Sequence, residues 1–143
     1  MKKFLIVCVS ACLFFSCSNH GKKIAIEGTR GEVYYKEGAT EAEAQKLGAY
    51  LKSEKYFSNE AATTVQLRKA KGEGYDVHFV VDEEKVKATP GIEDQFIIIG
   101  DAISKTVFNG KPVNIFLSDQ KLKDFKSLPY NKQKAEELIS RPQ

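Results

Sequence analysis

Cysteine and histidine are scarce in this sequence. The chain has three cysteines, all within the first 17 residues, and two histidines, His20 and His78. A zinc site needs several Cys or His ligands, a nucleophilic Ser or Cys needs a base beside it, and no Gly-x-Ser-x-Gly segment is present. The sequence therefore predicts no catalytic residues, no metal site and no cofactor.

Long apolar runs are also missing. The apolar run over residues 4–15 has twelve residues, whereas a membrane-spanning helix needs roughly 20. Lys2 and Lys3 precede this run, and small Ser16 follows it. A positive start, a short apolar stretch and a small residue are typical of an export signal, so we expect residues 1–16 to be a signal peptide.

The residues at the end of the apolar run are similar to a known sequence motif. The segment Leu13-Phe14-Phe15-Ser16-Cys17 resembles the lipobox of bacterial lipoproteins, which ends in a small residue followed by the cysteine that receives the lipid. It departs from that pattern at Phe14, where a smaller aliphatic residue is usual. The resemblance implies cleavage before Cys17 and fatty acyl chains, such as palmitate, on the new N-terminus. The alternatives are ordinary signal cleavage that leaves Cys17 as a free thiol, or a short uncleaved anchor.

Lipidation at Cys17 would leave a mature chain without a free thiol. Cys8 and Cys12 would leave with the signal, so no disulfide framework would support the fold. Removing Lys2 and Lys3 from the 22 basic residues leaves 20 against 19 acidic ones. This balance does not favour nucleic acid as a partner. No acid follows Cys17 up to Lys23, and because some bacteria use acids there to reach the outer surface, we expect an outer-membrane protein that faces the periplasm.

For the remainder of the chain, we predict a tether over residues 17–23 and one α+β domain over residues 24–143. Two extended pieces flank Gly28-Thr29-Arg30-Gly31. Thr40 and Glu43 form a capping box for a helix, Thr89 is expected to cap a second helix, and Ser118 is expected to cap a helical turn. From residue 31 the order is β-α-β-β-α-β, which favours an antiparallel ferredoxin-like sheet with two helices on one face, an extra N-terminal strand and a C-terminal helix.

The two central strands form a predicted hairpin. Alternation places Val65 and Leu67 on one face with Phe79. Pairing Leu67 with Phe79 leaves Gly72-Glu73-Gly74 as a three-residue loop, in which Gly74 supplies the left-handed position. In this register His78 lies opposite Arg68. Residues 82–84, an acidic run, are interpreted as the solvated exit of the second strand.

The run from Gly31 to Asp119, with "GEVYYKEGATEAEAQKLGAYLKSEKYF" and "VFNGKPVNIFLSD", resembles a domain of uncharacterised, membrane-associated bacterial proteins. The resemblance implies one compact module on a membrane and no catalytic residue.

The sheet face away from the two helices is the candidate binding surface. We expect these side chains to gather there: Tyr34, Lys36, Gln66, Arg68, His78, Val80, Asn114 and Phe116. Of these, Tyr34, Arg68, His78 and Phe116 are the predicted site residues. Apolar side chains on such a face suggest that it is covered, by the C-terminal helix, a partner protein or a second copy.

Two functions remain open at this point. The first is a lipid-anchored, non-catalytic interaction module of the cell envelope, which binds the membrane through Cys17 and an envelope protein or its own copy through the sheet. The second is a small-ligand-binding or hydrolytic domain that works around His78.

Overall fold

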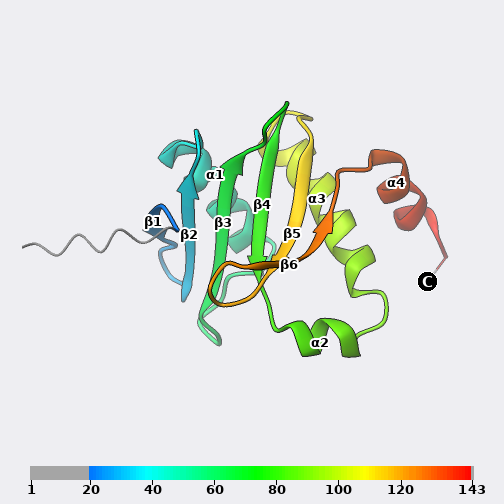
Figure 1. The fold of residues 1–143 in the computed structure, drawn as a ribbon, viewed down its shortest axis with the longest axis horizontal. Helices are drawn as coiled ribbons and strands as arrows, with labels where there is room; N and C mark the ends of the chain where they lie inside the picture. The colour runs from blue at the N-terminus through cyan, green and yellow to red at the C-terminus, as the bar shows by residue number, and fades with distance from the viewer. Residues whose placement is uncertain (1–19, 143) are drawn as a thin grey trace, which may run out of the picture.

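The computed structural model describes residues 20–142 as one sheet with helices packed on it (Figure 1). The six strands are β1 (Lys22–Ala25), β2 (Gly31–Lys36), β3 (Thr63–Lys69), β4 (Tyr75–Val80), β5 (Val113–Ser118) and β6 (Asp124–Leu128). The four helices are α1 (Glu41–Ser53), α2 (Glu83–Ala88), α3 (Ile92–Val107) and α4 (Lys132–Ser140). The α+β class is thus confirmed, and β1 begins two residues before the predicted domain start at residue 24.

The strands lie in the sheet in the order in which they occur in the chain. The order is β1-β2-β3-β4-β5-β6, with β2·β3 and β4·β5 parallel and the other three pairs antiparallel. The predicted ferredoxin-like antiparallel sheet is therefore wrong, because α1 connects two adjacent parallel strands and no strand is inserted between them. This order also leaves the outer edge of β2 free for β1, a pairing that a ferredoxin-like order would not allow.

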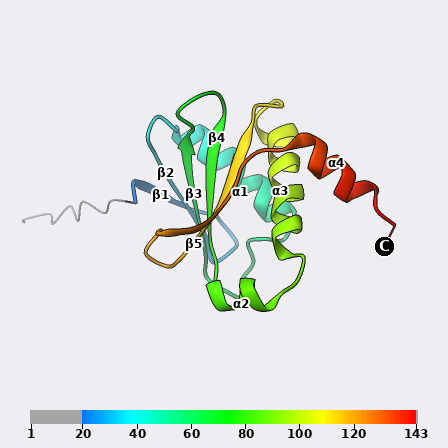
Figure 2. The same cartoon turned by 45° about the vertical axis from the view of Figure 1, so that its right-hand side comes forward.

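Helices α1 and α3 cover one face of the sheet (Figures 1 and 2). The capping box of Thr40 and Glu43 starts α1, as predicted. The core between these helices and the sheet consists of fully buried apolar side chains, among them Val33, Leu47, Val65, Leu67, Val77, Phe79, Ile103 and Leu117. We call the opposite side of the sheet the second face.

Two local predictions, at Thr89 and Ser118, are wrong, and a third is incomplete because the acidic run is exposed after β4 but also starts a helix. Thr89 ends α2 instead of starting α3, which begins after Gly91 in the left-handed conformation without a side-chain cap. Asp82 caps α2 through its side chain, so the acidic run is a helix start. Ser118 ends β5, and the residues after it return as strand β6.

The β3–β4 hairpin has another register than predicted. Val65 pairs with Phe79 and Leu67 with Val77, a shift of two residues. A two-residue shift keeps every side chain on its predicted face, so the alternation of apolar residues could not distinguish the two registers.

Candidate functional site

The second face carries the predicted site residues on four neighbouring strands, β2 to β5. His78 on β4 lies opposite Gln66 of β3 and beside Phe116 of β5, rather than opposite Arg68 as predicted. Its ring stacks on Phe116 with the ring centroids 4.5 Å apart. Arg68 lies two residues further along β3, opposite Asp76. Tyr34 lies on β2, where it contacts the ring of His20 edge to face.

The α4 helix does not lie over this surface, because it packs against α3 instead (Figure 2). The cover comes from the β5–β6 connection, residues 119–123, which passes in front of β3 and β4 in Figure 1. The first described residue completes it, since His20 Nε2 and the carbonyl of Lys121 lie 3.3 Å apart. Part of the second face is therefore covered by His20 and by the β5–β6 connection.

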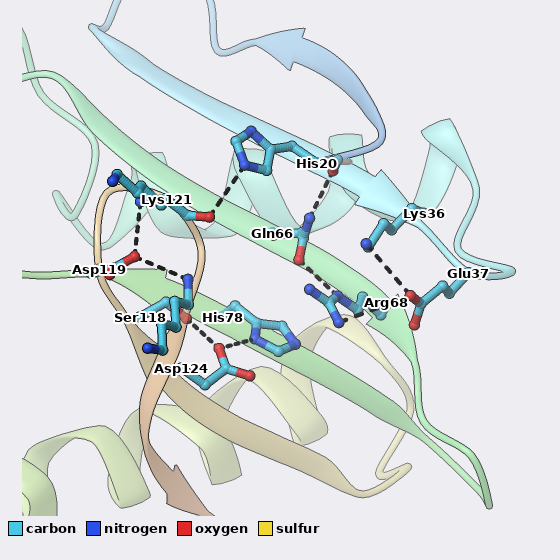
Figure 3. Close-up of polar contacts among 11 residues, drawn as sticks. His20, Lys36, Glu37, Gln66, Arg68, His78, Ser118, Asp119, Lys121 and Asp124 are labelled. Carbon is cyan, nitrogen blue, oxygen red and sulfur yellow. Dashed lines mark hydrogen bonds and ion pairs between the residues drawn. The ribbon is translucent and has the colours of Figure 1, made fainter. Parts of the chain in front are cut away.

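His78 lies in the closed part of this surface (Figure 3). Its side chain is only 3% exposed, and its Nδ1 lies 2.8 Å from Asp124 Oδ1. The same carboxylate oxygen accepts a hydrogen bond from the hydroxyl of Ser118 at 2.5 Å. Among the described residues, His78 Nε2 is the one buried side-chain polar atom without a hydrogen-bond partner.

The surroundings of His78 favour its neutral form. Burial lowers the pKa of the imidazole and outweighs Asp124, whose hydrogen bond and charge act in the opposite direction. The neutral ring donates its Nδ1 proton to Asp124 and keeps a lone pair on Nε2. A Ser–His–Asp triad needs the hydroxyl at that second nitrogen, but Ser118 contacts the aspartate, so these three residues do not form such a triad.

Gln66 links the N-terminal residues to the sheet. Its side chain is fully buried; its amide nitrogen donates to the carbonyl of His20 at 2.7 Å, and its oxygen accepts from Arg68 Nε at 2.7 Å. Arg68 in turn lies 3.9 Å from Glu37. Sequence reasoning placed Gln66 on this face but gave it no role, because its partner His20 lies 46 residues away in the chain.

A second polar cluster lies at the opposite side of the sheet, at the start of α1. Glu43 Oε1 accepts hydrogen bonds from Lys69 Nζ at 2.7 Å and from the hydroxyl of Tyr75 at 2.6 Å. Tyr75 also stacks on Phe108 with the centroids 3.7 Å apart. The capping box identified Glu43 from the sequence, but no local pattern indicated that Lys69 and Tyr75 meet it.

Hollows of the described surface lie away from His78. One of about 520 Å³ is formed by α2, the start of α3 and β6, including Val86, Ile92 and Phe125. Another of about 580 Å³ lies where β4 and β5 end, beside Asp82 and Asp119. Among the described residues, the side chain of His78 is almost fully buried, and it lines neither of these two hollows.

Residues 20–142 contain neither a metal-binding cluster nor a membrane-spanning helix. No group of three or more His, Cys, Asp or Glu side chains in this range could hold a metal ion. No helix in this range is both long and apolar enough to cross a bilayer. Cys17, the predicted lipid site, lies outside the described residues.

Comparison with known proteins places the chain in a family. Searches of curated proteins and of solved structures found no match. A family model, AF_1994_N, described as a family N-terminal domain, matches residues 23–129, which run from β1 through the end of β6. The chain therefore belongs to the AF_1994_N family.

Proposed function

We propose that the protein is a lipid-anchored, non-catalytic interaction module of the bacterial cell envelope. This proposal rests on the burial of His78 beneath the cover of the second face. The strongest candidate for a general base, His78, is 3% exposed, and its free nitrogen has no solvent contact. General base catalysis needs that nitrogen within hydrogen-bond reach of a substrate, and the geometry argues against such a contact.

The anchor in this proposal is a lipid on Cys17, after removal of residues 1–16. Two or three acyl chains make membrane attachment stable, whereas one chain gives only marginal binding. The described domain has no helix that could replace this anchor. We place the protein in the outer membrane, facing the periplasm, with the half-buried Tyr34, Arg68 and Phe116 as its interaction surface and no nucleic acid as a partner.

Mass spectrometry of the protein from native membranes tests the anchor. We expect a mature N-terminus at Cys17 with attached acyl chains, and we expect Cys17→Ser to move the protein to the soluble fraction. Ser16→Ala is the matched control, because it keeps a small residue before the cysteine. An unmodified Cys17 in the wild-type protein would contradict the proposal.

A small-ligand-binding or hydrolytic role at His78 is the second candidate. The unpaired Nε2 favours it, because a buried polar atom without a partner costs free energy that a bound group can recover. Turnover of an ester or phosphoester by the purified protein, lost in His78→Ala and kept in His20→Ala, would support this role over the first.

A further inference from the structure

We propose that the partner of the second face is the bilayer itself, with lipid headgroups lying against the surface around His20. This inference rests on the proposed lipid anchor at Cys17 and adds to it an orientation. It commits to the membrane that holds the anchor, and a protein partner on this face is an outcome that the test can detect.

The first step is that His20 is attached to the folded domain. Its carbonyl accepts the hydrogen bond from buried Gln66 at 2.7 Å, its Nε2 lies 3.3 Å from the carbonyl of Lys121, and its ring contacts Tyr34. Gln66 lies on β3 and Lys121 in the β5–β6 connection (Figure 3), and Tyr34 lies on β2. His20 is therefore held on the second face by three separate parts of the fold.

The second step is the length of chain between the lipid and this fixed residue. His20 is only three positions after Cys17, and an extended chain spans at most about 3.6 Å per residue, or roughly 11 Å in all. A domain of this size has a radius of gyration of roughly 14 Å. Because the link is shorter than the domain's own radius, the anchored protein cannot turn freely, and the side that carries His20 must face the bilayer.

The third step is the charge of the surface around His20. Three lysines lie on the segments that meet there, Lys23, Lys121 and Lys123. Lys22 pairs with Tyr35 and therefore lies on the helix-covered face of the sheet. Lys23 pairs with Glu32 at 3.1 Å and lies 5.8 Å from the centre of the Tyr34 ring. Within residues 20–142, no carboxylate lies in ion-pair distance of Lys121 or Lys123.

The nearest acid to the two loop lysines is already engaged. Asp119 Oδ1 accepts the backbone N–H groups of Lys121 and Lys123 at 2.8 and 3.0 Å. These backbone hydrogen bonds, together with the charges of both lysines, lower the pKa of Asp119. Neither ammonium group forms an ion pair within residues 20–142. Lysine heads at a membrane surface interact with headgroup phosphates and fall within the roughly 10 Å Debye length at 0.1 M salt. Tyrosine is enriched at the same interface, and Tyr34 lies among these lysines.

A pair of labels at opposite sides of the domain tests this orientation. The acylated full-length mature protein is placed in vesicles of phosphatidylglycerol and phosphatidylcholine that contain a headgroup-spin-labelled lipid. One fluorophore is attached through Gln120→Cys in the β5–β6 connection, and in a second sample through Lys46→Cys on α1, across the sheet. Both positions are exposed. We expect several-fold stronger quenching at residue 120 than at residue 46.

Charge reversal tests the lysines in the same vesicles. We expect Lys121→Glu with Lys123→Glu to reduce quenching at residue 120 at least twofold, while Lys46→Glu leaves it unchanged and both variants keep the circular dichroism of the parent. Equal quenching at residues 120 and 46, or a crosslink from residue 120 to a protein in native membranes, would overturn the orientation. Failure of the acylated protein to float with vesicles would instead overturn the anchor itself.

Discussion

At the scale of single residues, Glu43 makes more contacts than any sequence pattern assigns to it. Its carboxylate accepts from the backbone of Thr40 at 2.9 Å, from Lys69 Nζ and from the hydroxyl of Tyr75. Partial burial acts to raise the pKa of Glu43, but the hydrogen bonds from Lys69, Tyr75 and Thr40 outweigh it and lower the pKa to about 2. One side chain thus joins the start of α1 to the ends of β3 and β4.

The lowered pKa of Glu43 predicts how stability depends on acid. Because the folded-state pKa lies below the ordinary value of 4.5, the unfolded chain takes up the proton first as the pH falls. The stabilisation is complete above about pH 4.5 and is lost as the pH approaches 2. We expect Glu43→Gln to lower the free energy of unfolding by about 1–2 kcal/mol at pH 7 and by much less at pH 2.5, measured by urea denaturation.

Glu41→Gln is the matched control for this measurement. Glu41 lies in the same first turn of α1 and receives a longer hydrogen bond, at 3.3 Å, from Tyr35. We expect Glu41→Gln to change stability by a few tenths of a kcal/mol, as is usual for exposed substitutions. A Glu43→Gln protein that differs from wild type by the same amount at both pH values would contradict the assignment of the low pKa to Glu43.

At the scale of elements, the sequence predicted which face of each strand is buried, but it did not predict which residues pair across neighbouring strands. The alternation of apolar residues placed the core sides of β2, β4 and β5 correctly, because burial repeats every second residue. It did not determine the β3–β4 register, since a shift of two residues leaves the faces unchanged. Thr89 shows a similar limit: its hydroxyl bonds back to the carbonyl of Lys85, and a Thr-Pro pair alone does not say whether a helix ends or begins there.

The observed hairpin register makes a prediction about its two glycines. Gly74 has a φ of +95°, and a Cβ there would lie 2.0 Å from the carbonyl oxygen of Pro112, which accepts the bond from Tyr75 N at the start of the β4–β5 pairing. Gly72 has open space around it. We expect Gly74→Ala to cost about 2 kcal/mol or more and Gly72→Ala to cost less than about 0.5 kcal/mol.

Chemical denaturation of the two variants measures this difference. If Gly72→Ala were as damaging as Gly74→Ala, the loop would not be centred on Gly72 as the observed register requires. Amide exchange at Tyr75 gives a second readout, because its N–H bonds to the carbonyl of Pro112, which a Cβ at residue 74 would displace.

At the scale of the whole molecule, one side of the sheet forms the apolar core under the helices, and the other side is polar and partly covered. Composition and element order predicted the α+β class and the helix-covered face. They could not predict the strand order, because a β-α-β unit reads the same whether its two strands are adjacent or separated by another strand. Nor could they predict the cover of the second face, which depends on His20 and Lys121, 101 residues apart in the chain.

The two sides of the sheet should respond differently to the loss of a phenyl ring. Phe79 is completely buried beneath α1 and α3 and contacts Tyr56 and Phe96, so Phe79→Ala should cost about 3–5 kcal/mol. Phe116 is half-buried on the second face and stacks on His78. We expect Phe116→Ala to cost well under half as much in the same denaturation experiment. Equal losses would mean that the second face is packed as tightly as the core.

The strand order also bears on how the chain assembles. Every strand pairs with the strand that precedes it in the chain, so the sheet grows at one edge as each new segment is added. The β1–β2, β3–β4 and β5–β6 pairs close short connections, which costs little entropy and favours rapid folding. The β2–β3 and β4–β5 pairs close over longer connections that contain α1, and α2 with α3. A chain that emerges N-terminus first, from a ribosome or from an export channel, can therefore build this sheet in order without reopening any earlier pair.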